Sequence, residues 1–404
     1  MFSLRYGPES QLRLELPASI EIFDHSSPQG LEIADPAAAV IEALAAPLDY
    51  PPLTAATVPG DRVVVAVDCT VPQAGKVLEG CLRTLIGGQT RPEDIRVLTN
   101  GDTTFAESLL QWAPGDVRYA IKVTRHDPDD KQSHAYLAAT EEGNPIHVNR
   151  LLVDADVVLP VGVLRLDSSL AYYGSAGTIF PSFADRETQK RYERSETDDR
   201  SRHEQARRKE SQEVAWLLGA PMTLQIIPGR QDALLGVIAG EIRAIDKEGQ
   251  RLCQQAWNYR LPHRAGLVVA TIGGGPSQQT WEGFARALDA ALDAVAEQGA
   301  VVLCTSLSER PGPAMKSIAS WSGDKAVPKR IRRDLSGDGL SAFQIADTRE
   351  RVHVYLMSDL PQAKVEELGL GHVTGPDEIA RLCRQYDSCA LLGDAQYAAV
   401  TIAS

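Results

Sequence analysis

The sequence predicts an α/β protein: two domains with mainly parallel sheets and a cleft between them. Short runs rich in valine and isoleucine alternate with stretches of helical periodicity, as in parallel sheets that helices cover on both faces. The chain has 404 residues, of which 43% are apolar, so it is long for one hydrophobic core and suits two domains. We expect the domains at residues 1–262 and 266–390, and we expect a tail, residues 391–404, to return toward the first domain.

The elements of the first domain follow from apolar runs and helical spacing. Runs of valine, leucine and isoleucine predict buried strands, whereas apolar residues spaced three and four apart predict helices. The expected strands are residues 62–67, 94–99, 157–164, 224–227 and 234–239. The expected helices are residues 76–86, 105–112 and 210–219, the last ended by Gly219 and Pro221.

A domain boundary is expected near residues 260–264, because a fresh strand-turn-helix-strand series follows. This βαβ unit is typical of a second α/β domain. Residues 306–342 show no sustained period and predict a loop or lid. The series comprises a strand at 266–272, a turn at 273–276, a helix at 281–298 ended by Gly299, and a strand at 300–305. Beyond the loop we expect a strand at 352–357, helices at 361–368 and 376–386, and a strand at 398–402.

Charge and composition exclude several classes of function. The formal net charge is −13, which argues against nucleic acid, because phosphate binding needs clustered lysine and arginine. The basic run at 200–209 is interleaved with acids and predicts a solvated helix face. Six cysteines without a C-x-x-C spacing indicate reduced, buried thiols rather than zinc. No signal peptide or membrane-spanning run is evident, so we expect a soluble, cytoplasmic protein; a homo-oligomer stays open.

A loop of small residues follows the strand at 157–164. Gly174, Ser175, Gly177 and Thr178 let backbone N–H groups approach a bound group closely, as anion-binding loops do. We therefore expect a small anionic molecule, a carboxylate or phosphate, as the partner of this loop. The alternative is a tight turn between two buried elements, and the loop alone does not separate the two interpretations.

Asp68 and Thr70 directly follow the strand at 62–67. The carboxyl ends of strands in an open α/β sheet face the usual ligand crevice. We therefore expect both side chains in the cleft, near the loop at 174–178. The alternative is that they cap the helix at 76–86.

These segments resemble motifs of the nickel-dependent lactate racemase family. Asp68-Cys-Thr-Val-Pro72 is similar to the family's Asp-x-Thr-Arg-Pro, and the glycine loop followed by Pro181 and Glu187-Thr188 is similar to its central motif. Gly274-Gly275-Pro276, before a long helix, is similar to its Gly-Gly-x-Pro segment. The resemblance covers most of the chain. It implies two α/β domains around a cleft and racemisation of a hydroxy acid with a nickel-pincer nucleotide tethered to a lysine.

Five functional positions of the family carry other residues in this chain. No lysine occurs between Lys131 and Lys190, so a small shift in alignment cannot supply the tether. All eight histidines lie away from the matched positions, and His203 is the nearest candidate replacement. The matched positions are Gly177 for the tethering lysine, Val71 for the carboxylate-binding arginine, Thr103 and residues 166–169 for the two acid/base histidines, and Tyr192 or Glu193 for a nickel-binding histidine.

On the helix after the Gly-Gly-x-Pro segment, the family's Tyr-Gln pair and lysine fall on Glu282, Gly283 and Arg286. An arginine there could bind a carboxylate bidentately, whereas an ion pair with Glu282 four residues earlier is the alternative. Catalytic residues stay unassigned, and no metal site is expected. The expected ligand-binding residues are Asp68, Thr70, Thr103, Gly174, Ser175, Gly177, Thr178, Gly274, Gly275 and Arg286.

The missing groups leave three hypotheses open. Racemising a hydroxy acid needs a hydride acceptor and an acid/base group of near-neutral pKa on each face of the substrate, which histidine supplies. Five substitutions predict that the family's mechanism and its tethered cofactor are absent. One hypothesis is a diverged isomerase or epimerase for a hydroxy acid or sugar acid with an untethered cofactor. Another is a non-catalytic ligand-binding or regulatory protein. The least favoured is an intact nickel racemase.

Overall fold

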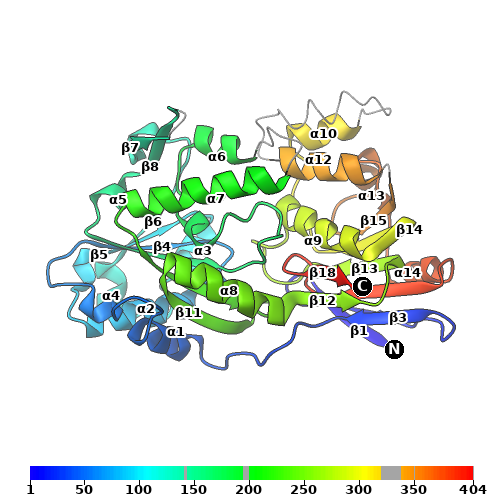
Figure 1. Cartoon of the computed structure of the whole chain (residues 1–404), viewed down its shortest axis with the longest axis horizontal. Coiled ribbons are helices and arrows are strands. Elements are labelled where there is room, and N and C mark those ends of the chain that lie inside the picture. Colours follow the sequence, from blue (N-terminus) through cyan, green and yellow to red (C-terminus); the bar gives the residue numbers. More distant parts are fainter. Residues whose placement is uncertain (141–142, 194–199, 320–337, 350, 404) are drawn as a thin grey trace.

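The computed structural model describes residues 1–140, 143–193, 200–319, 338–349 and 351–403. Two six-stranded sheets, each with helices packed beside it, make up most of the molecule (Figure 1). The expected α/β class with mainly parallel sheets is confirmed. Part of the expected loop or lid at residues 306–342 lies outside the described residues.

The first sheet has the strand order β11-β10-β9-β4-β5-β6. Every neighbouring pair is parallel except β10 and β11. Strand β4 is buried at all its residues, which explains its unbroken run of apolar side chains. The strands are β4 (Val63–Val67), β5 (Ile95–Thr99), β6 (Lys122–Arg125), β9 (Val157–Val163), β10 (Met222–Pro228) and β11 (Leu234–Glu241).

The second sheet has the order β16-β15-β14-β13-β17-β3, and all its pairs are parallel. Its edge strand β3 comes from the start of the chain, so the blue strands β1 and β3 lie beside yellow and red elements in Figure 1. The strands are β3 (Glu21–His25), β13 (Ala265–Thr271), β14 (Val295–Cys304), β15 (His353–Met357), β16 (Gly371–His372) and β17 (Ser388–Leu392).

Three two-stranded pairs complete the strands of the described residues. The last of them joins the end of the chain to the residues just before the second domain. The pairs are β1 (Phe2–Tyr6) with β2 (Ser10–Leu14), β7 (His134–Ala139) with β8 (Pro145–Asn149), and β12 (Asn258–Leu261) with β18 (Ala399–Ile402).

Helices pack beside both sheets, and none within the described ranges is long and apolar enough to cross a membrane. With the first sheet lie α1 (Pro36–Ala45), α2 (Ala74–Gly87), α3 (Thr103–Ser108), α4 (Gly115–Ala120), α5 (Arg150–Asp154), α6 (Arg186–Glu193), α7 (Arg200–Leu217) and α8 (Ile242–Trp257). With the second lie α9 (Trp281–Ala294), α10 (Pro313–Ala319), α12 (Gly339–Thr348), α13 (Gln362–Glu367) and α14 (Pro376–Cys383).

One large apolar cluster includes side chains of both sheets, for example Val65 of β4 and Val301 of β14. Trp257, at the end of α8, belongs to it and is 1% exposed. The indole N–H of Trp257 donates to the Pro228 carbonyl over 2.9 Å, which satisfies its buried polar atom. The two sheets therefore share one apolar core.

Several element limits differ from the expectation. The helix expected at 281–298 ends at Ala294, because Val295 already has extended backbone and begins β14. Gly299 is therefore not a helix cap; a Cβ at Gly299 would lie 2.6 Å from the Gly266 carbonyl oxygen. The helix expected at 105–112 is the shorter α3, and the basic run at 200–209 is continuous with the following helix as α7.

Candidate functional site

A cavity of about 460 Å³ opens where the carboxyl ends of β4 and β9 approach α9 of the second domain. Its walls come from both domains, as expected for an open α/β sheet. Six of the ten residues predicted from sequence line it: Asp68, Thr70, Gly174, Gly177, Thr178 and Arg286. Whether they contact a ligand stays a prediction.

Asp68 stands directly beyond β4 in a fixed orientation. One carboxylate oxygen accepts hydrogen bonds from the Thr70 backbone N–H at 2.8 Å and from the Thr70 hydroxyl at 2.5 Å. The other oxygen accepts from the Asn100 side-chain amide at 3.0 Å. The expected alternative, capping of the next helix, is not seen, because Gln73 occupies the N-cap of α2 without a side-chain cap bond.

The small-residue loop forms a short 3₁₀ turn, Ser175–Thr178. Gly174 has a φ of 79°, a conformation that favours glycine. The Ser175 N–H donates to the Asp246 carboxylate at 2.8 Å, and the Gly177 N–H donates to the Gly174 carbonyl at 3.0 Å. Ser175 itself is buried and does not line the cavity. These two N–H groups are thus used within the protein, as the turn interpretation expects.

Thr178 closes the loop against the sheet. Its hydroxyl accepts a hydrogen bond from the Gln225 side-chain amide at 3.1 Å. Gly162 of β9 allows this approach, because a Cβ there would lie 2.1 Å from the Thr178 hydroxyl oxygen. The loop is therefore packed rigidly under the cavity.

Arg286 reaches the cavity from α9. It forms the ion pair with Glu282 that the sequence offered as the alternative, and its Nε donates to the Leu170 carbonyl at 3.0 Å. Its side chain is 11% exposed. Arg286 thus joins the second domain to the segment between β9 and the loop, and it places a positive charge at the cavity.

Arg165 is a cavity residue that the sequence did not single out. It lies two residues beyond β9, is 4% exposed, and donates from Nη1 to the Gln396 carbonyl at 3.1 Å. Its guanidinium lies 4.9 Å from the ring centre of Tyr397, while Nη2 has no hydrogen-bond partner among the described protein groups. A single arginine in the apolar run VGVLRL was the signal that could have revealed it.

Burial, and secondarily the charge of Arg286, lowers the pKa of Arg165 to about 10. Arg165 is therefore still a cation at neutral pH. A buried cation that lacks a full set of partners is costly, and an anion in the cavity would offset that cost.

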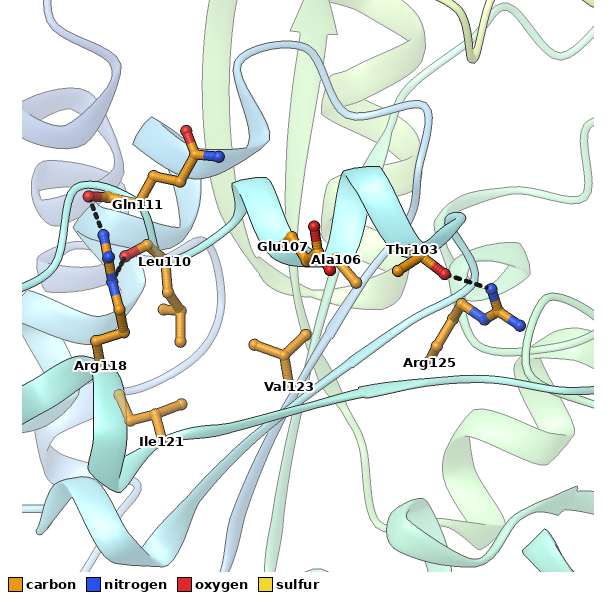
Figure 2. Close-up of a pocket in the computed structure, with 9 residues that line it drawn as sticks. All are labelled: Thr103, Ala106, Glu107, Leu110, Gln111, Arg118, Ile121, Val123 and Arg125. Carbon is orange, nitrogen blue, oxygen red and sulfur yellow. Dashed lines mark hydrogen bonds between the residues drawn. The ribbon is translucent and has the colours of Figure 1, made fainter.

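Thr103, Gly274 and Gly275 lie outside this cavity. Thr103 lines a second pocket of about 420 Å³ beside β6, where its hydroxyl accepts a hydrogen bond from Arg125 at 2.9 Å (Figure 2). Gly274 has a φ of 91° in the turn after β13. The segment after that turn is linked to the cavity wall through Gln278, whose side-chain amide donates a hydrogen bond to the Thr70 carbonyl at 3.3 Å.

His126 lines the cavity from the end of β6 and is buried, although the sequence suggested no histidine there. Its Nε2 lies 3.0 Å from the Ala184 carbonyl and its Nδ1 lies 3.2 Å from the Asn149 side-chain amide. Burial lowers the pKa of His126 to about 4. Both ring nitrogens are occupied and the ring is neutral at pH 7, so His126 is a structural residue.

The described residues do not fit a lysine-tethered nickel-pincer nucleotide. The cavity wall, as far as the structure describes it, contains arginines but no lysine, and Gly177 stands at the place of the tether. Within the same described part of the chain, no group of three or more histidine, cysteine or acidic side chains could hold a metal ion. The side chain of His203, the candidate replacement, lies outside the described residues.

Comparison with known proteins assigns the chain to a family. Residues 6–203 match the family model described as the lactate racemase N-terminal domain. This chain belongs to the lactate racemase-like family. No curated protein sequence matches the chain significantly. The assignment agrees with the motifs around Asp68 and the glycine loop.

Two solved structures share the fold. The lactate racemase apoprotein from Thermoanaerobacterium thermosaccharolyticum matches with a TM-score of 0.80 at 15% identity, over 99% of each chain. A protein from Thermotoga maritima matches with a TM-score of 0.67 at 16% identity, over 92% of this chain and 100% of the other. At these identities the likeness shows the fold of the lactate racemase-like chain and not its activity.

Proposed function

We propose that this protein is a diverged lactate racemase-like scaffold that binds a small hydroxy acid or sugar acid by its carboxylate, without a lysine-tethered nickel-pincer nucleotide. The observation that carries the proposal is Arg165. This buried cation lines a cavity formed by both domains, and its Nη2 has no protein partner among the described residues.

The charge around the cavity supports a carboxylate ligand. Arg286 also lines the cavity, and burial together with the charge of Arg286 lowers the pKa of Arg165, whereas the smaller effects of Glu282 and Asp68 raise it. The Nη2 atom of Arg165 is covered by protein atoms in this structure. A carboxylate that reached the guanidinium would accept a charge-assisted hydrogen bond from it, and in a buried site such a bond contributes about 1.5 to 3 kcal/mol. Backbone N–H groups of the loop are less suited to this role than the sequence predicted, because those of Ser175 and Gly177 already have acceptors.

The titratable groups of the cavity favour binding over racemisation by the family's route. That route needs a proton acceptor of near-neutral pKa on each face of the substrate. Burial raises the pKa of the Cys69 thiol and of the Tyr172 hydroxyl well above their usual values, and it lowers that of His126. These three groups are neutral at pH 7 and keep their protonation state across the physiological range.

Ligand binding can be measured by thermal shift and calorimetry with a panel of hydroxy acids and sugar acids. We expect at least one acid to stabilise the protein, and we expect Arg165→Met to weaken its affinity about tenfold or more, because the charge-assisted bond is lost. Arg62→Met is the matched control, because Arg62 is exposed and pairs with Asp156 away from the cavity.

Two results would contradict this proposal: no acid stabilises the unmodified protein, or Arg165→Met binds the acids as tightly as Arg62→Met does. A chiral assay on the acids that bind then tests for remaining isomerase or epimerase activity. Conversion of one stereoisomer into another would show that the scaffold is still an enzyme.

A further inference from the structure

We infer that the ligand is a polyhydroxylated acid, with its carboxylate at Arg165 and its hydroxyl groups at Asp68 and the polar wall around it. This inference rests on the proposed function and deepens it, because it separates sugar-acid-like ligands from short hydroxy acids. Its basis is that Arg165, a cation that donates hydrogen bonds, and Asp68, an anion that accepts them, line the same cavity.

The Asp68 carboxylate accepts hydrogen bonds, so a ligand group that contacts it should be a hydrogen-bond donor. A carboxylate accepts hydrogen bonds and repels a second carboxylate, so the acid group of the ligand belongs at Arg165 and not at Asp68. Three protein donors hold Asp68, two from Thr70 and one from Asn100. The two oxygens of a carboxylate offer about four acceptor sites, so capacity for a ligand hydroxyl remains.

Asn100 acts as a positioning residue for this acceptor. It follows β5, the neighbour of β4 in the sheet. Its side-chain oxygen accepts the Cys69 backbone N–H at 2.8 Å, and this bond orients the amide so that its nitrogen donates to Asp68. The orientation of Asp68 is therefore set before any ligand arrives, which favours selective binding of a donor.

The size and wall of the cavity favour a chain with several hydroxyl groups. A volume of about 460 Å³ is many times the space that one water molecule needs, and a three-carbon acid would leave most of it filled with water. Uncharged polar side chains from several segments of the chain line the cavity. They are Thr70, Asn100, Thr178, Ser182, Gln189 and Ser341.

The experiment compares four probes by calorimetry on the full chain: gluconate, hexanoate, sorbitol and lactate. Gluconate carries both the carboxylate and the hydroxyl groups, whereas hexanoate lacks the hydroxyl groups and sorbitol lacks the carboxylate. We expect the affinity for gluconate to be at least about ten times the affinity for each of the other three probes. This comparison needs no variant, so it does not depend on whether a substituted protein folds.

Two variants test which side chains cause the preference for gluconate. Asp68→Asn removes the negative charge and replaces one acceptor oxygen with a donor, so the advantage of gluconate over hexanoate should largely disappear, while hexanoate itself should bind no more weakly. Arg165→Met should weaken both acids together. The matched control is Asp156→Asn, a carboxylate in a surface pair outside the cavity, and it should preserve the order of the four probes.

The outcomes separate the two claims. If acids bind through Arg165 but gluconate shows no advantage over hexanoate or lactate, the inference is overturned and the proposed function stands. Tighter binding of an α-amino acid such as alanine than of gluconate also overturns it, because an ammonium group would then be the donor at Asp68. If no carboxylate binds at all, the proposed function itself fails.

Discussion

Two buried ionisable side chains, Arg165 and Asp394, lie at the contact between the two domains. Arg165 follows a strand of the first sheet and bonds to Gln396, near the end of the chain. Asp394, from the same terminal segment, accepts the Gln231 backbone N–H at 3.0 Å, and its other oxygen has no partner among the described protein groups. Both side chains are almost fully buried, so each joins distant parts of the chain at an electrostatic cost.

Asp394 makes stability depend on pH. Burial raises its pKa from 3.8 to about 7, with Gln231, Arg230 and Arg5 acting in the opposite direction. The folded protein therefore holds a proton that the unfolded chain releases above pH 3.8. This stabilising contribution is present at low pH and is lost as pH rises toward 7; the shift corresponds to about 4 kcal/mol.

Asp394→Asn removes this titration and retains the shape of the side chain. Compared with the unmodified protein, we expect the variant to gain relative stability as pH rises from 4 to 8, and to melt at the higher temperature at pH 8. Thermal unfolding at a series of pH values measures this, with Asp156→Asn as an exposed control. Melting curves of Asp394→Asn and the unmodified protein that shift in parallel with pH would refute the role of Asp394.

At the scale of elements, close packing sets the limits that local patterns leave open. The Ala-Leu periodicity after Trp281 predicts a helix to residue 298, but the chain turns into β14 at Val295. Gly299 then permits close approach to the Gly266 carbonyl. The loop at 174–178 shows the same effect, because it is held against β9 by the contact between Thr178 and Gly162.

Gly162→Ala tests the packing of that loop. The added Cβ would lie 2.1 Å from the Thr178 hydroxyl oxygen and 3.0 Å from a Gln225 side-chain oxygen. We expect a loss of about 1 to 3 kcal/mol in the free energy of unfolding, as for other overpacked cores. Urea unfolding measures it. Gly87→Ala, where an added Cβ meets nothing within 4 Å, is the matched control and should be neutral or slightly stabilising. Equal stability of the two variants would argue against tight packing.

At the scale of the whole molecule, the two ends of the chain complete the second domain and its junction. Strand β3 pairs with β17, so Glu21 lies beside Ser388, and β18 pairs with β12. The cavity is formed where the two sheets meet, and its walls combine the Asp68 motif with α9. The site therefore depends on how the domains are placed as much as on either domain alone.

The whole protein should carry no covalent nickel-pincer nucleotide. Gly177 stands at the tether position, and the described wall of the cavity offers no lysine. Intact-mass spectrometry of protein made together with the cofactor-synthesis enzymes should show the mass of the unmodified chain. A lysine-containing lactate racemase made in the same way is the positive control, and an adduct on any lysine of this chain would refute the expectation.

The sequence alone determined the α/β class, the central strands β4, β5, β9 and β13, and the position of Asp68 and Thr70 beyond β4. These features are local. Valine-rich runs predict strands that are buried on both faces of a parallel sheet, and the ends of such strands predict the position of the ligand crevice. The departures from the family's lysine and histidine positions were also visible in the sequence.

The tertiary structure decided which of these residues meet. Arg165 could not be found from local patterns, because its importance comes from Gln396, more than 200 residues later, and from the absence of a second partner among the described groups. The sequence also does not reveal that N–H groups of the glycine loop already have acceptors. The Ser175 N–H donates to Asp246, which lies on a helix from another part of the chain. Periodicity records which side chains are buried, whereas contacts between distant segments depend on how the folded chain packs.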